Sequence, residues 1–135
     1  MAYLIRVPEG ADLHSHVKRL LSELKVQGAL LFGIGGLSRA KLGYFDFSSR
    51  SYVERELEEQ LELVSLLGNA ALLDGEPHVH LHATLAGRDY RALAGHLLEA
   101  RVHPFVELGI LTTSHRAIRS FSEQKGLFLL LQERP

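Results

Sequence analysis

Four of the eight histidines in this chain fall within one stretch, Pro77–His96. Three of them alternate with apolar residues: His78, His80 and His82. Successive side chains of an extended strand point to opposite faces, so these three imidazoles share one face. A polar turn follows, and a hairpin centred near Asp89 places His82 opposite His96. Cβ atoms of such cross-strand partners lie roughly 4.5–5.5 Å apart, close enough for two imidazoles to bind one metal ion.

The spacing of these histidines is typical of a site for zinc or a similar divalent transition metal. Neutral imidazole binds such ions at roughly 2.0–2.1 Å. His80 and His82 from one strand, with His96 from the returning strand, make three ligands and leave a fourth position for water, a small molecule or an anion. Water bound there could act as a nucleophile, because zinc lowers its pKa to about 7. The sequence predicts this metal site, assigns no catalytic residue and leaves open whether the site is catalytic.

Two more residues are candidates for supporting positions around the metal. His78 lies on the same strand face, one step further along, as a spare ligand. Glu107 is a carboxylate in an otherwise apolar segment, so it needs a partner if it is buried. It could orient a ligand histidine or act as a general base. The alternative for the whole set is that these are half-buried sheet histidines or hydrogen-bonding groups at a subunit interface.

The segments around the histidines predict a sheet. The strand candidates outside the histidine stretch are Ala2–Val7, Ala29–Ile34, Lys41–Asp46, Tyr52–Leu57, Leu61–Leu73, Phe105–Thr112 and Gly126–Leu131. Asp74-Gly75 favours a tight hairpin that leads into the histidine strand, which should therefore lie between two neighbours.

Three local signals refine this sheet. Ala29–Ile34 is continuously apolar, as expected for a strand buried on both faces. The glycines Gly33, Gly35 and Gly36 indicate a bulge, a sharp bend or a close backbone contact. Pro104 cannot donate to a strand ladder, so a strand should begin just beyond it.

One amphipathic helix is predicted between the first two strands. Asp12 is a good N-cap, and Gly28 supplies a stop. The apolar residues between them have helical spacing: Leu13, Val17, Leu20, Leu21 and Leu24. His14 and His16 fall in the first turn, where we expect solvent. The fold class is α+β (α/β): one compact domain over residues 1–135, with a largely antiparallel mixed sheet and this helix packed on it.

Composition restricts the partners and the compartment. The net charge of −1 and the pI near 6.7 argue against autonomous DNA binding. The chain has no cysteine, so any zinc-type site must use histidine and carboxylate. The N-terminus lacks the pattern of a signal peptide, and no apolar run approaches the length of a membrane span. We therefore expect a soluble cytoplasmic protein that does not bind membranes.

Several segments resemble the plants-and-prokaryotes conserved (PPC) domain family: GALLFGIGGLSRAKLGYFD, LELVSLLGN, HVHLHATLAGRDYRALAGHLLEARV and PFVELGIL. The most specific parts are the His-x-His strand (His80, His82), Gly95-His96-Leu97 after the turn, and Val106-Glu107. The glycine before His96 is usually doubled in the family, and here the pair is Ala94-Gly95.

The resemblance implies a compact α/β fold, a homotrimer and, for some prokaryotic members, a metal site. Plant members carry AT-hook segments that bind AT-rich DNA, but this chain has none, since Gly87-Arg88-Asp89 is acidic where a hook would be basic. Three functions remain open. They are a metal-binding trimer with a regulatory or ligand-binding role, a metal-dependent hydrolase or hydratase, and a DNA-associated regulator by family analogy.

Overall fold

The structure, a computed structural model, describes residues 1–131 of the chain. Its elements follow in this order: β1 (Ala2–Val7), α1 (Leu13–Glu23), β2 (Ala29–Asp46), β3 (Ser51–Leu57), β4 (Leu61–Leu73), β5 (Glu76–Ala86), β6 (Ala92–Thr112), β7 (Arg119–Ser122) and β8 (Leu127–Leu130). Strand residues make up 66% of residues 1–131. The fold is therefore mostly antiparallel β with one short helix, which supports the α+β expectation only loosely.

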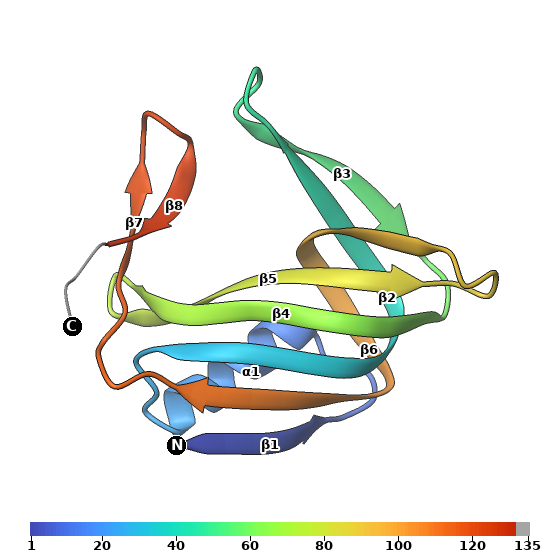
Figure 1. Cartoon of the computed structure of the whole chain (residues 1–135), viewed down its shortest axis with the longest axis horizontal. Coiled ribbons are helices and arrows are strands. Elements are labelled where there is room, and N and C mark those ends of the chain that lie inside the picture. Colours follow the sequence, from blue (N-terminus) through green and yellow to red (C-terminus); the bar gives the residue numbers. More distant parts are fainter. Residues whose placement is uncertain (132–135) are drawn as a thin grey trace.

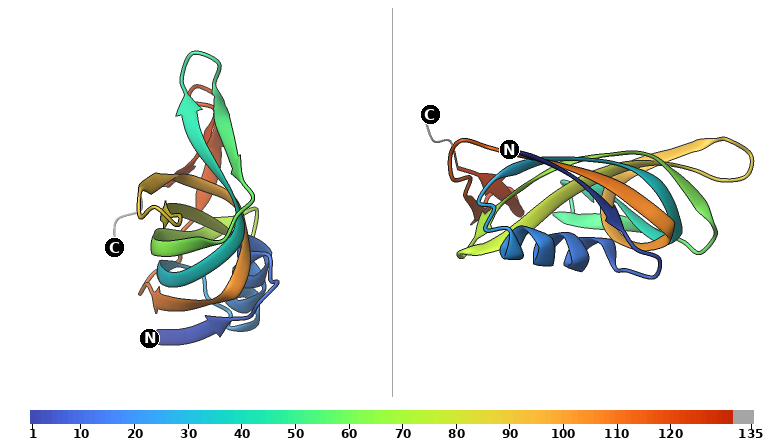
Figure 2. Two further views of the ribbon diagram at one scale, coloured as in Figure 1. Left: turned by 90° about the vertical axis from the view of Figure 1, so that its right-hand side faces the viewer. Right: turned by 90° about the horizontal axis from the view of Figure 1, so that it is seen from below.

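Six strands form one sheet that curls on itself. Their order is β1-β6-β5-β4-β2-β3, and β2 also pairs with β6. All of these pairings are antiparallel. Because β2 and β6 are long, different parts of each pair with different neighbours, and the sheet bends around the helix. Figures 1 and 2 show this curvature, with the β2–β3 arm rising above β5 and the β7–β8 hairpin rising at the other end.

Two strands continue through positions where the sequence predicts an interruption. The glycine segment does produce the expected irregularity, a register shift between Gly33 and Gly35, but β2 continues through it. The expected strand start beyond Pro104 is wrong, because β6 runs through this proline. The pairing of β6 with β2 shifts register on either side of it, which is where a residue without an N–H is tolerated.

Ala29–Ile34 is not buried on both faces. Leu31 is 0% exposed, whereas Leu30 and Phe32 are 46% and 43% exposed. The segment thus alternates like a strand with one face on the core, although both sets of side chains are apolar. The prediction was wrong because composition alone cannot say what covers the second face.

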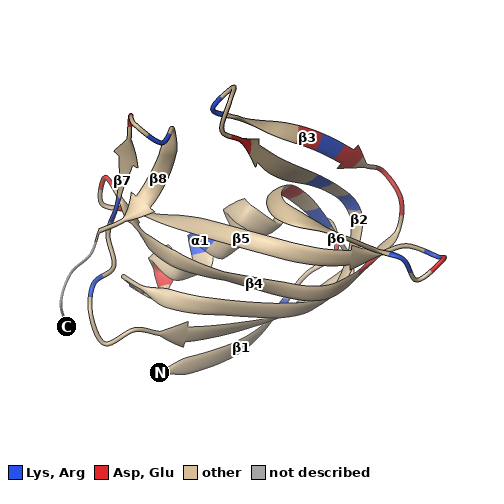
Figure 3. Cartoon of the chain, turned by 45° about the horizontal axis from the view of Figure 1, so that its top comes forward, with Lys and Arg blue, Asp and Glu red and all other residues tan. Residues whose placement is uncertain are grey.

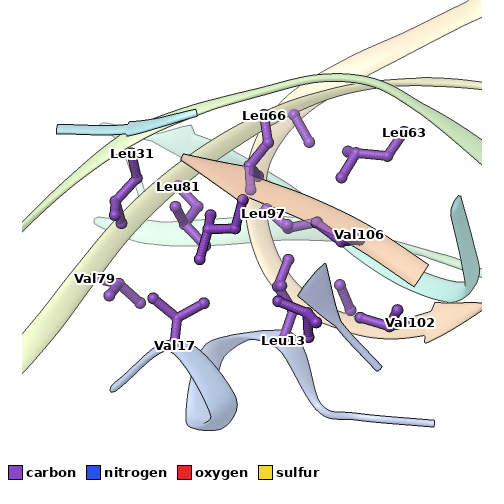
Figure 4. Packing of buried hydrophobic residues seen from close by; sticks show 14 of the residues in the cluster. Leu13, Val17, Leu31, Leu63, Leu66, Val79, Leu81, Leu97, Val102 and Val106 are labelled. Carbon is purple, nitrogen blue, oxygen red and sulfur yellow. The ribbon is translucent and has the colours of Figure 1, made fainter. Parts of the chain in front are cut away.

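Helix α1 closes the core side of the sheet. Its Leu13, Val17 and Leu21 are fully buried and pack with core residues of the strands (Figure 4). The Asp12 carboxylate accepts from the Ser15 N–H at 3.0 Å, so the predicted N-cap is confirmed. The helix ends before Gly28, with Lys25 taking the left-handed conformation instead. The helix described within residues 1–131 is too short to cross a membrane.

The two predicted hairpins that frame β5 are confirmed. Asp74 and Gly75 both have positive φ, as the tight turn between β4 and β5 requires. Residues His82 to Ala86 of β5 pair with Ala92 to His96 of β6, and His82 lies opposite His96 as expected. Strand β5 therefore lies between β4 and β6, which fixes where its histidines project.

Candidate metal centre

Strand periodicity presents three histidines on one face of β5. Val79, Leu81 and Ala83 are buried in the core at 7%, 1% and 4% exposure. The side chains between them, His78, His80 and His82, project away from the core and remain partly or fully exposed. The three apolar side chains pack against the core that α1 covers. This packing fixes the face from which the imidazoles project.

His80, His82 and His96 come together as a cluster, which we call the histidine triad. One nitrogen from each ring lies within 4.8 Å of the others. The ring centroids are 5.0 Å apart for His80 and His82, 5.2 Å for His80 and His96, and 5.3 Å for His82 and His96. Nε2 of His80 and Nε2 of His82 are 3.2 Å apart. Two nitrogen ligands of a tetrahedral zinc ion lie about 3.3–3.4 Å apart, so this spacing suits a shared ion as well as a hydrogen bond.

The environment keeps two members of the triad in the form that binds metals. Burial, with smaller contributions from the charges of Arg119 and His82, lowers the pKa of His80 to about 4. Burial also lowers the pKa of His96 to about 4, with contributions from His80 and His82. A metal binds neutral imidazole, so neither ring has to lose a proton at neutral pH.

One neighbouring ring orients His96. Tyr52 of β3 stacks on His96, with centroids 4.7 Å apart and an interplanar angle of 27°. Nδ1 of His96 is buried and has no hydrogen-bond partner within residues 1–131. The donor set is thus three clustered imidazoles, which fits zinc and related divalent transition metals.

The structure separates the two supporting candidates. His78 lines the same pocket as the triad, and its ring lies 5.6 Å from that of Phe128, but it is not part of the three-nitrogen cluster. Glu107 is exposed on β6, opposite Arg6 of β1 and Ile34 of β2, and it does not line the pocket. The structure therefore does not bring Glu107 to the histidines.

His14 is not solvated as expected. Its Nε2 lies 2.9 Å from the carbonyl oxygen of Leu97, and it lines the pocket beside the triad. Burial lowers the pKa of His14. The helical pattern alone could not place this residue, because the contact depends on how the first turn of α1 meets β6.

The triad forms part of the wall of a pocket of about 800 Å³. The pocket is lined by residues of the β2–β3 arm and of the β7–β8 hairpin, which both rise above β5 in Figure 1, toward its two ends. Its walls contain Lys18, Tyr52, Asn69 and Arg119, none of which sequence reasoning selected. Arg119 lies in a segment of mixed composition with no motif, so only the tertiary fold reveals it.

The comparisons with known proteins point to one family. The sequence matches the Plants and Prokaryotes Conserved (PCC) domain, the family abbreviated PPC above, over residues 1–114. The fold is similar to a metal-containing protein from Archaeoglobus fulgidus, with 36% identity, a TM-score of 0.90, and coverage of 98% of this chain and 94% of that chain. No curated protein matches the chain.

Two further solved structures are similar over nearly the whole chain. A plant- and prokaryote-conserved protein from Pyrococcus horikoshii is 33% identical, with a TM-score of 0.92 and coverage of 100% of this chain and 94% of that chain. A candidate DNA-binding protein from Bacteroides thetaiotaomicron is 27% identical, with a TM-score of 0.93 and coverage of 98% and 93%. The family match covers most of the chain and agrees with these structures, so this protein belongs to the plants-and-prokaryotes conserved domain family.

Proposed function

We propose that this protein is a homotrimeric metal-binding domain with a regulatory or ligand-binding role, and that His80, His82 and His96 hold a zinc-like ion. The observation that carries the proposal is the convergence of three imidazole nitrogens within 4.8 Å in the wall of a pocket. The Archaeoglobus relative, described as metal-containing, supports it. Three protein ligands leave one coordination position toward the pocket, where a small molecule can bind.

Metal analysis of purified protein tests this proposal. Protein prepared without chelator should carry about one zinc-like ion per chain by elemental mass spectrometry, and His80→Ala should lose it. His115→Ala is the matched control, because His115 is exposed and lies outside the pocket. Metal-free wild-type protein that does not take up zinc, or equal metal content in His80→Ala and wild type, would show that the triad is not a metal site.

Self-association is supported by an apolar surface on the outer face of the sheet. Leu30 and Phe32 of β2 are exposed, and their cross-strand partners Leu111 and Leu67 are 42% and 56% exposed. We call these four residues, with Ile34, the outer apolar face. Exposed apolar patches of this kind mark interaction sites, and a second copy of the chain is the occupant that the family resemblance implies.

A metal-dependent hydrolase or hydratase is an alternative use of the same site. A three-histidine zinc site with an open position is the arrangement of carbonic anhydrase. Within residues 1–131, however, no aspartate or glutamate lines the pocket to serve as a general base. Histidine can also act as a general base, and His14 and His78 line the pocket, so this alternative stands beside ligand binding.

DNA association is the remaining candidate, and the Bacteroides relative favours it. The charge distribution argues against DNA association. The basic residues of the β2–β3 arm lie beside acidic ones in Figure 3, and Arg39 and Lys41 both pair with Glu99, at 3.0 Å and 3.6 Å. A gel shift with AT-rich duplex decides the matter: DNA binding requires a shift that weakens as salt rises.

A further inference from the structure

Arg119, at the start of β7, is a buried cation that has no counter-ion within residues 1–131. It is 5% exposed. Its Nη1 donates to the carbonyl oxygen of Phe128 at 3.2 Å and its Nη2 donates to Oδ1 of Asn69, but Nε has no hydrogen-bond partner in the described part of the chain. None of the ion pairs within residues 1–131 involves Arg119. A buried charge without an opposite charge is costly, so this position favours an anion.

Arg119 lies beside the histidine triad. Asn69, which accepts its hydrogen bond, is the direct β4 partner of His80 on β5. Lys18 of α1 lines the same pocket, and within residues 1–131 no acidic side chain does. The pocket wall is therefore positive before any metal ion is counted, and a bound anion would face charges of one sign only.

The rest of the pocket identifies the kind of anion. Apolar and aromatic side chains dominate its walls, including Tyr52 of β3 and Phe128 of β8. The volume, about 800 Å³, is in the range of small-molecule sites. A guanidinium binds carboxylate and phosphate alike, but the single negative charge of a carboxylate matches the single charge of Arg119, whereas a phosphate group carries up to two. The pocket thus offers one cationic side chain that can bind a carboxylate, and apolar walls that can enclose the rest of the ligand.

We propose that Arg119 is the anion-binding residue of this pocket, and that the ligand is a small organic carboxylate with an apolar or aromatic body. The inference rests on the proposed function in one respect: the carboxylate faces both Arg119 and the ion that the triad holds. The β7–β8 hairpin contributes to both parts of the ligand site, because it supplies Arg119 and the apolar Phe128.

Calorimetric titration of zinc-loaded protein tests the proposal with three carboxylates: phenylacetate, 4-phenylbutyrate and hexanoate. At least one should bind ten times more tightly than its neutral amide and than acetate. Inorganic phosphate should bind more weakly than that carboxylate. The proposal is overturned if no carboxylate exceeds its amide, or if phosphate binds more tightly than all three.

Variants assign the contact to Arg119. Arg119→Met should weaken carboxylate binding about tenfold or more, since it removes a charge-assisted hydrogen bond. Arg116→Met is the matched control, because Arg116 is exposed and outside this pocket, and binding should not change. If circular dichroism shows that Arg119→Met is unfolded, Arg119→Lys replaces it. Arg119→Lys keeps the charge and loses the planar fork, so it should still weaken binding severalfold. Unchanged binding in the folded variant overturns the assignment.

Metal content, measured on every sample, separates this inference from the proposed function. Protein that holds zinc but does not prefer carboxylates leaves the metal site intact and overturns only the ligand class. Protein that does not bind zinc overturns the proposed function. Arg119→Met that retains zinc and loses carboxylate binding supports the inference directly.

Discussion

At the scale of single residues, the triad shows how neighbours decide what a histidine can do. His80 and His82 project from one strand, and His96 from the strand opposite. All three are close, but His78 on the same strand face is not in the cluster. His96 lies directly opposite His82, so the rings meet near that pair. His80 is one same-face position away from His82 and His78 is two, so only His80 is near enough to join them.

The contrast between His82 and His78 leads to a first prediction. His82→Ala should weaken zinc binding by more than about 100-fold, because it removes one of three ligands. His78→Ala should weaken it by less than about tenfold. Competition titration with a chromophoric chelator measures both. Equal losses in the two variants would mean that His78 is a ligand.

A second prediction concerns acid stability of the metal-free protein. The pKa values of His80 and His96 are lowered to about 4 in the folded state, against an ordinary value of 6.5. Between these values the unfolded chain binds protons that the folded chain does not, so falling pH favours unfolding. Well above pH 6.5 both groups are neutral in the folded and the unfolded states, so they no longer affect the free energy of unfolding.

Urea unfolding of chelator-treated protein at pH 7.5, 6, 5 and 4.5 measures this effect. The free energy of unfolding should fall from pH 6.5 toward pH 4. His96→Phe, which can keep the stack on Tyr52, should flatten the fall, whereas His115→Phe should not. A wild-type profile that is flat across this window would contradict the lowered pKa values.

At the scale of elements, the close approach of β4 to β5 positions His80. Gly68 of β4 lies so near that an added Cβ would stand 2.0 Å from the carbonyl oxygen of His80. Backbone cannot give way as a flexible side chain can. Strand β5 can therefore lie this close to β4 only because residue 68 is a glycine.

The third prediction follows from this contact. Gly68→Ala should lower the free energy of unfolding by about 1–3 kcal/mol, as overpacking does, and should weaken zinc binding by moving His80. Gly109→Ala is the control on another strand, because its Cβ would meet Phe32 at an ordinary 3.5 Å. Urea unfolding and zinc titration of both variants measure the difference. A Gly68→Ala protein as stable as Gly109→Ala would show that β4 and β5 separate easily.

At the scale of the whole molecule, the sheet has two apolar faces, and helix α1 can cover only one of them. Helix α1 covers the inner face, and the outer apolar face is left exposed within residues 1–131. His82 is the β5 partner of Leu67, so the triad borders this outer face. A second copy placed on it would lie beside the proposed metal site.

The fourth prediction tests this arrangement. Phe32→Glu should convert the proposed trimer to monomer, because a charge buried at a subunit interface is not compensated. Tyr90→Glu is the control, since Tyr90 is 91% exposed and lies on a hairpin loop. Light scattering coupled to gel filtration gives the mass of each. A Phe32→Glu protein with the mass of wild type would exclude this face as the interface.

The sequence by itself determined the local features of this protein. The period-two alternation placed His78, His80 and His82 on one face, and the turn residues set the register that pairs His82 with His96. These features depend on neighbours in the chain, so residue type and spacing are enough to predict them. The N-cap at Asp12 and the Asp74-Gly75 turn were predictable for the same reason.

Tertiary structure alone decided which distant segments surround the triad. It placed Arg119 beside His80 and turned His14 toward Leu97, and it left Glu107 outside the pocket. It also showed that Ala29–Ile34 has one exposed face. Such outcomes depend on how the curled sheet brings β2, β6 and the β7–β8 hairpin around β5. No local pattern encodes them, because burial and charge at these positions are set by residues far away in the chain.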